Sequence, residues 1–241
     1  MGEQRLDVAL VQRGLVPSRE RAQEAIAAGM VLVGGKPATK AALKVGEADS
    51  IVVTGDPIRY VGRGGLKLER ALDHFAIDPA GLVCMDVGAS TGGFTDCLLS
   101  RGARFVYAVD VGRGQLHPSL RADPRVAVME GTDIREVREL VHSPELAAVD
   151  VSFISLTLVL PAVARLIAPA GRVIALIKPQ FEVGPGGVGK GGIVRDKGQH
   201  RAAVDRVLLA ARALGLKPGE VIPSPIRGTE GNQEFLTILA R

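Results

Sequence analysis

Charged residues stand directly after apolar segments that are typical of buried strands. Lys178 follows the five apolar residues 173–177, and Asp150 lies at the end of another apolar segment, in AVDVSFIS. Lys67 follows a Gly-Gly pair, and Glu234 lies in GTEGNQEFL, before the last apolar segment. A charge is costly to bury unless it is paired, which makes Asp150 the expected partner of Lys178. Such a set could bind and deprotonate a hydroxyl group; alternatively, Lys178 and Asp150 form an ion pair that only closes the edge of a sheet.

A glycine-rich turn follows another predicted strand. Residues 82–87 run into GASTGG at 88–93, and a helix is expected from Phe94. A strand, a glycine turn and a helix N-terminus let a ligand approach the backbone closely. The dinucleotide pattern G-x-G-x-x-G fails because Ser90 takes the second glycine position, and no Gly-Lys-Ser/Thr follows as in a Walker A loop. A nucleotide phosphate is therefore a poor ligand for this turn.

Acidic residues at strand ends surround the same turn. Asp86 ends the strand before it, Asp110 ends the next strand, and Asp133 follows the third. A carboxylate about 20 residues beyond such a turn typically accepts a pair of ribose hydroxyls, and Asp133 could receive an adenine amino group. The set predicts S-adenosylmethionine, a cation that carries a ribose and an adenine. The alternative is that these carboxylates cap the helices that follow them.

Methyl transfer from a sulfonium needs an in-line approach and a proton acceptor for the attacking group. The Pro-Pro-aromatic turn typical of amino-group methylation is absent, because Asp150 is followed by Val-Ser-Phe. Cys84 and Cys97 lie in a predicted strand and helix and are expected in the core. A ribose hydroxyl is therefore the favoured acceptor. The sequence leaves open whether Lys178 accepts the proton or orients the hydroxyl.

Two units of different size must position these residues. Residues 2–54 predict two helices, a hairpin around Gly34-Gly35 and a closing strand at 51–53. Residues 55–65 are expected to be a linker, and from 66 to 241 strands and helices alternate as in a doubly wound α/β sheet. The predicted strands are 82–87, 105–109, 126–129, 148–151, 173–177, 220–223 and 235–239; the predicted helices are 66–75, 94–100, 134–142, 156–168 and 197–214.

Basic residues gather in the small unit and in a glycine-rich loop. In the small unit they could form a phosphate-binding face. The alternative is an ordinary solvated surface, since acidic residues are interspersed among the basic ones. The loop at 181–195 is expected to be a basic flap over the substrate, or else a flexible surface loop. The candidate RNA-binding residues are Arg5, Arg13, Arg19, Arg21, Lys36, Lys190 and Arg195.

Composition narrows the classes of protein. Lys and Arg outnumber Asp and Glu by 30 to 26, a net charge of +4 that tilts towards an anionic partner. Two Cys and four His suit neither a disulfide scaffold nor a common zinc site, so no metal is expected. We expect a cytoplasmic protein without a membrane span, since no apolar segment approaches the roughly 20 residues that a bilayer requires. Aromatic residues make up 3%, which disfavours a row of exposed stacking rings.

The ordered motifs resemble a known family. They are GRGGLKLERAL, DVGASTGGFTD, VDVSFISL, IKPQFE, GKGGIVRD and GNQEF. The first unit resembles the S4-like RNA-binding domain, and the remainder resembles the FtsJ-like ribose 2′-O-methyltransferases. The two together resemble the TlyA family, haemolysin-like cytidine-2′-O-methyltransferases that act on ribosomal RNA. The resemblance implies an α/β, Rossmann-like, S-adenosylmethionine-dependent methyltransferase sheet with a small N-terminal α+β S4-like domain.

The resemblance also implies roles for residues. The catalytic Lys-Asp-Lys-Glu tetrad would be Lys67, Asp150, Lys178 and Glu234. Cofactor-binding residues would be Asp86, Gly88, Ser90, Gly92, Gly93, Phe94, Thr95, Asp110 and Asp133. Ribosomal RNA or ribosomal subunits are the implied partners, with 16S and 23S both open, and the chain is expected to be a monomer or a weak dimer. The alternatives are a membrane-acting haemolysin-like protein and an RNA-binding protein without catalysis.

Overall fold

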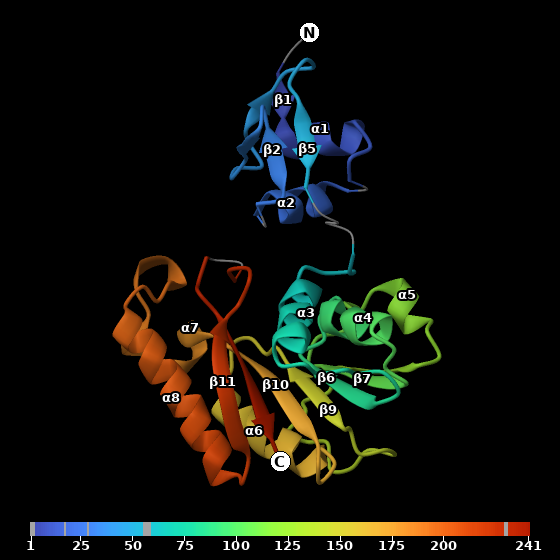
Figure 1. Cartoon of the computed structure of the whole chain (residues 1–241), viewed down its shortest axis with the longest axis vertical. Helices are drawn as coiled ribbons and strands as arrows, with labels where there is room; N and C mark the ends of the chain where they lie inside the picture. The colour runs from blue at the N-terminus through green and yellow to red at the C-terminus, as the bar shows by residue number, and fades with distance from the viewer. Residues whose placement is uncertain (1–2, 17, 28, 55–58, 229–230) are drawn as a thin grey trace. The chain divides into compact units, whose positions relative to one another are not determined.

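The chain folds into two compact units, each with its own apolar core (Figure 1). A computed structural model describes all residues except 1–2, 17, 28, 55–58 and 229–230. The units are Met1–Arg63 and Gly64–Arg241. Part of the predicted linker, residues 55–58, lies outside the described residues. The first helix of the large unit begins at Gly64, two residues before the predicted domain start.

The small unit combines two helices with short strands. Its elements are β1 (Gln4–Arg5), α1 (Leu6–Gln12), α2 (Arg19–Ala27), β2 (Val31–Val33), β3 (Lys36–Pro37), β4 (Lys44–Val45) and β5 (Ile51–Val53). Strands β3, β2 and β5 form an antiparallel sheet, and β1 pairs with β4. The hydroxyl of Ser18 accepts the N–H of Arg21 at 3.2 Å and caps α2. The two predicted helices and the hairpin are thus confirmed, whereas β1 and β4 are not among the predicted strands.

The large unit is a seven-stranded sheet with helices between its strands. Its elements are α3 (Gly64–His74), β6 (Val83–Val87), α4 (Gly93–Ser100), β7 (Phe105–Asp110), α5 (Pro118–Arg121), β8 (Val126–Glu130), β9 (Leu146–Val149), α6 (Leu156–Leu166), β10 (Arg172–Ile177), α7 (Pro179–Glu182), the 3-10 turns η1 (Pro185–Gly187) and η2 (Lys190–Gly192), α8 (Lys197–Ala213), β11 (Lys217–Pro223) and β12 (Phe235–Ala240). The strand order is β11-β12-β10-β9-β6-β7-β8. Strand β12 is antiparallel to β10 and β11, and the pairs from β10 to β8 are parallel.

Burial on both faces explains the apolar strands of this sheet. Every residue of β6 and β9 is buried, as expected for parallel strands that helices cover on both sides. Helices α6 and α8 share a core with Met85 and Val149, whereas α4 contacts α3, β6 and β7. The carboxyl ends of β6, β7, β9 and β10 therefore meet at one edge, where open α/β sheets bind ligands.

The predicted helix at 134–142 is wrong, because only a turn and irregular chain are found there. Val137 and Leu140 still pack on the core. Side chains from elsewhere in the fold bond backbone groups of this segment. Arg165 donates to the carbonyl of Val137 at 2.7 Å, and the N–H of His142 donates to the hydroxyl of Tyr107 at 3.0 Å. The apolar residues that suggested a helix are thus buried by an irregular segment.

No helix in the described part of the chain is long and apolar enough to cross a membrane. Within the same residues, no three side chains of His, Cys, Asp or Glu are grouped so that they could hold a metal ion.

Candidate active site and cofactor cavity

Strand register places three of the predicted catalytic residues at one edge of the sheet, and α3 brings the fourth to them. Ile177 in β10 pairs with Phe235 in β12, so Lys178 and Glu234 occupy the next positions on neighbouring strands. Asp150 follows β9, and its N–H donates to the carbonyl of Val87, the last residue of β6, at 2.9 Å. Lys67 comes from α3, far away in the sequence.

Two ion pairs hold these charges. Nζ of Lys178 lies 2.6 Å from Oδ1 of Asp150 and donates to the hydroxyl of Ser152 at 2.8 Å. Nζ of Lys67 donates to Oε2 of Glu234 at 2.6 Å. Lys67, Lys178 and Glu234 are 6%, 9% and 2% exposed, so all three are withdrawn from water. The expected partnership of Lys178 with Asp150 is therefore present.

The start of α3 links the two pairs. A Cβ built on Gly64 would lie 4.0 Å from Oδ2 of Asp150 and 3.6 Å from the ring of Phe94. Lys67 stands three residues further on, on the same side of the helix. Desolvation cancels much of the attraction within buried ion pairs, so two such pairs contribute little to folding stability. Their position at the ligand-binding edge of the sheet favours a catalytic role over a structural one.

A cavity of about 570 Å³ opens beside Asp150, a size typical of small-molecule sites. Four of the nine predicted cofactor residues line it, namely Gly88, Ser90, Asp110 and Asp133. The other five, Asp86, Gly92, Gly93, Phe94 and Thr95, are buried and do not line this cavity. The sequence therefore locates the turn correctly but does not separate the residues that face the cavity from those that support it.

Asp86 lies buried beneath the glycine turn. Its Oδ2 accepts the N–H and the O–H of Thr95 at 2.8 and 2.7 Å, while Oδ1 has no hydrogen-bond partner among the described residues. Burial raises the pKa of Asp86 to about 7, and the negative charge of Asp150 acts in the same direction. An unpaired buried carboxyl oxygen, together with Asp110 and Asp150 close by, makes this a site that suits a cation.

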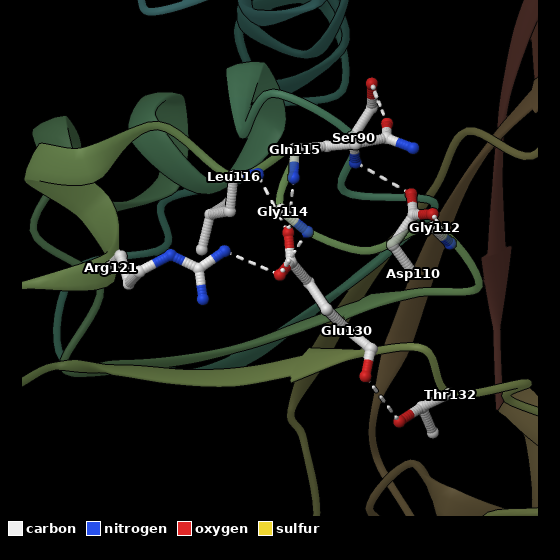
Figure 2. A network of polar contacts seen from close by, with 9 residues as sticks. All are labelled: Ser90, Asp110, Gly112, Gly114, Gln115, Leu116, Arg121, Glu130 and Thr132. Carbon is white, nitrogen blue, oxygen red and sulfur yellow. Dashed lines mark hydrogen bonds and ion pairs between the residues drawn. The ribbon is translucent and has the colours of Figure 1, made fainter.

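Asp110 and Asp133 take different partners at the cavity wall. Asp110 accepts the N–H of Ser90 at 2.8 Å and that of Gly112 at 2.7 Å (Figure 2), which leaves lone pairs on both oxygens. Asp133 forms an ion pair with Arg135, which lowers the pKa of Asp133. No helix follows Asp133, so the alternative reading of this residue as a helix cap is wrong.

Two aromatic rings near the ion pairs were not among the predicted residues. Phe153 lines the cavity, is 92% exposed and has a φ of 64°, which is unusual for a bulky residue. Its ring centre lies 5.3 Å from that of Phe181, and Nζ of Lys178 lies 5.9 Å from the Phe181 ring centre. The sequence signal that could have identified these two rings is their spacing, since each lies three residues after a predicted catalytic residue, Asp150 or Lys178.

The predicted RNA-binding arginines are partly engaged within the fold. Arg5 and Arg19 pair with the buried Asp7, and the hydrogen bond from Arg5 is the main cause of the lowered pKa of Asp7. Arg13 donates to the carbonyls of Gly46 and Asp49, each at 2.7 Å, and so fixes the turn that contains them.

The other candidates differ in exposure. Arg21 pairs with Glu24 at 2.9 Å, whereas Lys36 and Arg195 are exposed. The side chain of Lys190 lies outside the described part of the structure. Of the described candidates, Lys36 and Arg195 are exposed, and Arg13 also bonds the carbonyls of Gly46 and Asp49; the RNA-binding role of the seven stays a prediction.

Comparison with known proteins adds independent findings. The FtsJ-like methyltransferase family matches residues 60–241, and the S4 domain matches residues 4–51. The 16S/23S rRNA (cytidine-2′-O)-methyltransferase TlyA of Mycobacterium tuberculosis is 46% identical over 96% of this chain and 87% of its own. A solved structure of a hemolysin-like protein from Streptococcus thermophilus is 41% identical, with a TM-score of 0.77 over 100% of this chain and 89% of that one. An S-adenosylmethionine-dependent methyltransferase from Mesorhizobium loti shares the fold, with a TM-score of 0.53 at 14% identity over 75% of this chain and 100% of that one.

Proposed function

Because the chain belongs to the FtsJ-like methyltransferases and, with its S4 domain, to the TlyA family, we propose that it methylates the 2′-hydroxyl of a cytidine in ribosomal RNA, 16S, 23S or both. The methyl donor is S-adenosylmethionine. The observation that carries the proposal is the pair of buried lysine–carboxylate contacts beside the cavity. Ribosomal RNA or a ribosomal subunit is the macromolecular partner.

The cavity residues suit the parts of this cofactor. S-adenosylmethionine supplies a methyl group on a positively charged sulfur. Asp110 would accept the ribose hydroxyls, and Asp133 would lie near the adenine amino group. The carboxylate of Asp150, which lines the cavity, would face the cationic end of the cofactor. Asp86 does not line the cavity and would support the glycine turn through its hydrogen bonds with Thr95. Gly88 lines the cavity and has no side chain, so the cofactor can approach the backbone there.

The ion pairs would position the attacking hydroxyl. The Lys178 ammonium has three N–H donors; one is donated to Ser152, and Asp150 lies 2.6 Å away as its ion-pair partner. A remaining donor would orient the 2′-oxygen towards the methyl group. The proton that this oxygen loses would pass to the carboxylate of Asp150, since the Lys178 ammonium already carries three protons. Lys67, held by Glu234, would add positive charge at the same oxygen.

Phe153 would hold the base of the target nucleotide. Its ring is exposed at the cavity wall and is therefore free to stack on a base. Stacking of a base on an aromatic ring contributes roughly 1–3 kcal/mol. The ring of Phe181 packs against that of Phe153 and lies beside Lys178, so the base and the 2′-hydroxyl would be fixed together.

Replacing Asp110 with Ala should weaken cofactor binding at least tenfold and leave RNA binding unchanged. The substitution removes the proposed ribose acceptor and two hydrogen bonds that hold Ser90 and Gly112. Isothermal titration calorimetry with S-adenosylhomocysteine measures the effect. Asp123→Ala is the matched control, because Asp123 pairs with Arg125 and does not line the cavity. Unchanged affinity in Asp110→Ala would refute the ribose role.

Removal of residues 1–63 should leave cofactor affinity within twofold and reduce RNA capture at least tenfold. The two units have separate cores, so the large unit keeps the cavity and both ion pairs. Calorimetry with S-adenosylhomocysteine and gel-shift titration with ribosomal RNA measure the two affinities. Equal RNA affinity with and without the small unit would contradict this division of labour.

Transfer of tritiated methyl groups to purified ribosomal subunits tests the function itself. We expect label in RNA, and mapping of the modified nucleotide should show a 2′-O-methylcytidine. Lysis of erythrocytes without methyl transfer would support the membrane-acting alternative. RNA binding without transfer would support a protein that lacks catalysis. Label on a base, with none on ribose, would overturn the proposed acceptor.

A further inference from the structure

Glu130, the last residue of β8, gathers an unusual number of donors (Figure 2). Its Oε1 accepts the backbone N–H groups of Gln115 and Leu116 at 2.8 and 2.9 Å. Its Oε2 accepts the N–H of Gly114 at 2.9 Å and the guanidinium of Arg121 at 2.5 Å. These contacts, led by that of Arg121, lower the pKa of Glu130 to about 2, so the group is a carboxylate at any physiological pH.

The segment that Glu130 holds has little regular structure of its own. Residues 111–117 lie between the end of β7 and the start of α5 and form no helix or strand. Within it, the side-chain amide of Gln115 lies so close to Gly112 that a Cβ there would be 2.0 Å from Nε2. Gly112 and Gln115 both line the cavity. The bonds to Glu130 thus hold residues 114–116 of this wall, while Asp110 and Gly131 hold Gly112.

The same segment also holds the glycine turn. The hydroxyl of Ser90 donates to Oε1 of Gln115 at 3.3 Å, and the N–H of His117 donates to the carbonyl of Thr91 at 3.1 Å. Ser90 has a φ of 49°, a left-handed conformation that persists only where the surroundings enforce it. A chain of contacts therefore runs from Glu130 through Gln115 to Ser90 (Figure 2).

We propose that Glu130 is a positioning residue for the nucleoside half of the cofactor. It fixes the 111–117 segment, and through that segment the glycine turn, before the cofactor arrives. Glu130 itself does not line the cavity and so acts only through its neighbours. The proposal rests on the proposed function, because it assumes that the cavity takes S-adenosylmethionine. Preorganisation of this kind improves binding by removing the ordering cost from the binding step.

Glu130→Gln is the decisive substitution, because it keeps the size of the side chain. One amide oxygen can still accept Gln115 and Leu116, but the amide NH₂ then faces the N–H of Gly114 and the guanidinium of Arg121, where a donor meets donors. We expect S-adenosylhomocysteine to bind at least tenfold more weakly, with kcat at saturating S-adenosylmethionine and KM for RNA within twofold. Arg121→Met is the control: it removes one contact of Glu130, keeps the three N–H bonds and should change the affinity less than threefold.

Unchanged affinity for S-adenosylhomocysteine in Glu130→Gln would overturn the proposal, whether or not kcat falls. Should this variant fail to fold, hydrogen exchange of the wild-type protein without cofactor gives the answer. Slow exchange of the amides of Gly114, Gln115 and Leu116 supports a preformed segment, and protection that arises only on adding cofactor refutes it. Failure of the wild type to bind S-adenosylhomocysteine would refute the proposed function instead, and the exchange result would still decide whether Glu130 holds the segment.

Discussion

Replacing Lys178 with Met should lower methyl transfer at saturating cofactor by about 100- to 10,000-fold, the range associated with a positioned acid–base group. The substitution keeps the apolar stem and removes the ammonium group that Asp150 and Ser152 hold at the sheet edge. Affinity for S-adenosylhomocysteine should stay within threefold, because Lys178 does not line the cavity. Single-turnover transfer to ribosomal subunits measures the chemical step.

Loss of the ammonium also leaves Asp150 without its ion pair, so folding must be checked separately. Removing one partner of a buried pair can cost about 3–5 kcal/mol, and Asp150 is partly exposed, so we expect less. Thermal unfolding and cofactor binding provide the check. Lys197→Met, on an exposed residue at the start of α8, is the control. Transfer at the wild-type rate in both Lys178→Met and Lys67→Met would discredit the site.

Gly88→Ala should weaken cofactor binding at least 100-fold. A Cβ on Gly88 would lie 2.3 Å from the carbonyl oxygen of Asp150, and the φ of 88° is strained for any L-residue. Either the turn or the segment after β9 must move, and both line the cavity. Methyl transfer should fall as well, because the displaced backbone belongs to the residue that pairs with Lys178. Calorimetry and the transfer assay measure the two losses.

Gly81→Ala separates the collision from the backbone strain. Gly81 has a φ of 74° in the same unit, and a Cβ there would meet nothing within 4 Å. This variant should lose some thermal stability and keep its cofactor affinity. If Gly88→Ala and Gly81→Ala both bind S-adenosylhomocysteine like the wild type, the close approach of the turn to Asp150 has no functional importance.

The sequence alone determined the features that depend on neighbours in the chain. Apolar runs predict the strands, since a strand covered on both faces needs apolar residues at successive positions. The glycine turn follows from its position between a strand and a helix. Lys178 stood out because a charge after five apolar residues demands a partner, and the partner expected for it was found.

The tertiary structure decided everything that depends on distant segments. Lys67 meets Glu234 across 167 positions, and only the packing of α3 against β12 brings them together. In place of the predicted helix at 134–142, the structure has an irregular segment that forms hydrogen bonds with Tyr107 and Arg165. The spacing of apolar residues within the segment cannot reveal these distant partners. Glu130 looks like any acidic residue in the sequence, because its importance lies in three backbone N–H groups on another segment. Patterns along a chain report local preference and burial, whereas long-range pairing depends on how the whole sheet assembles.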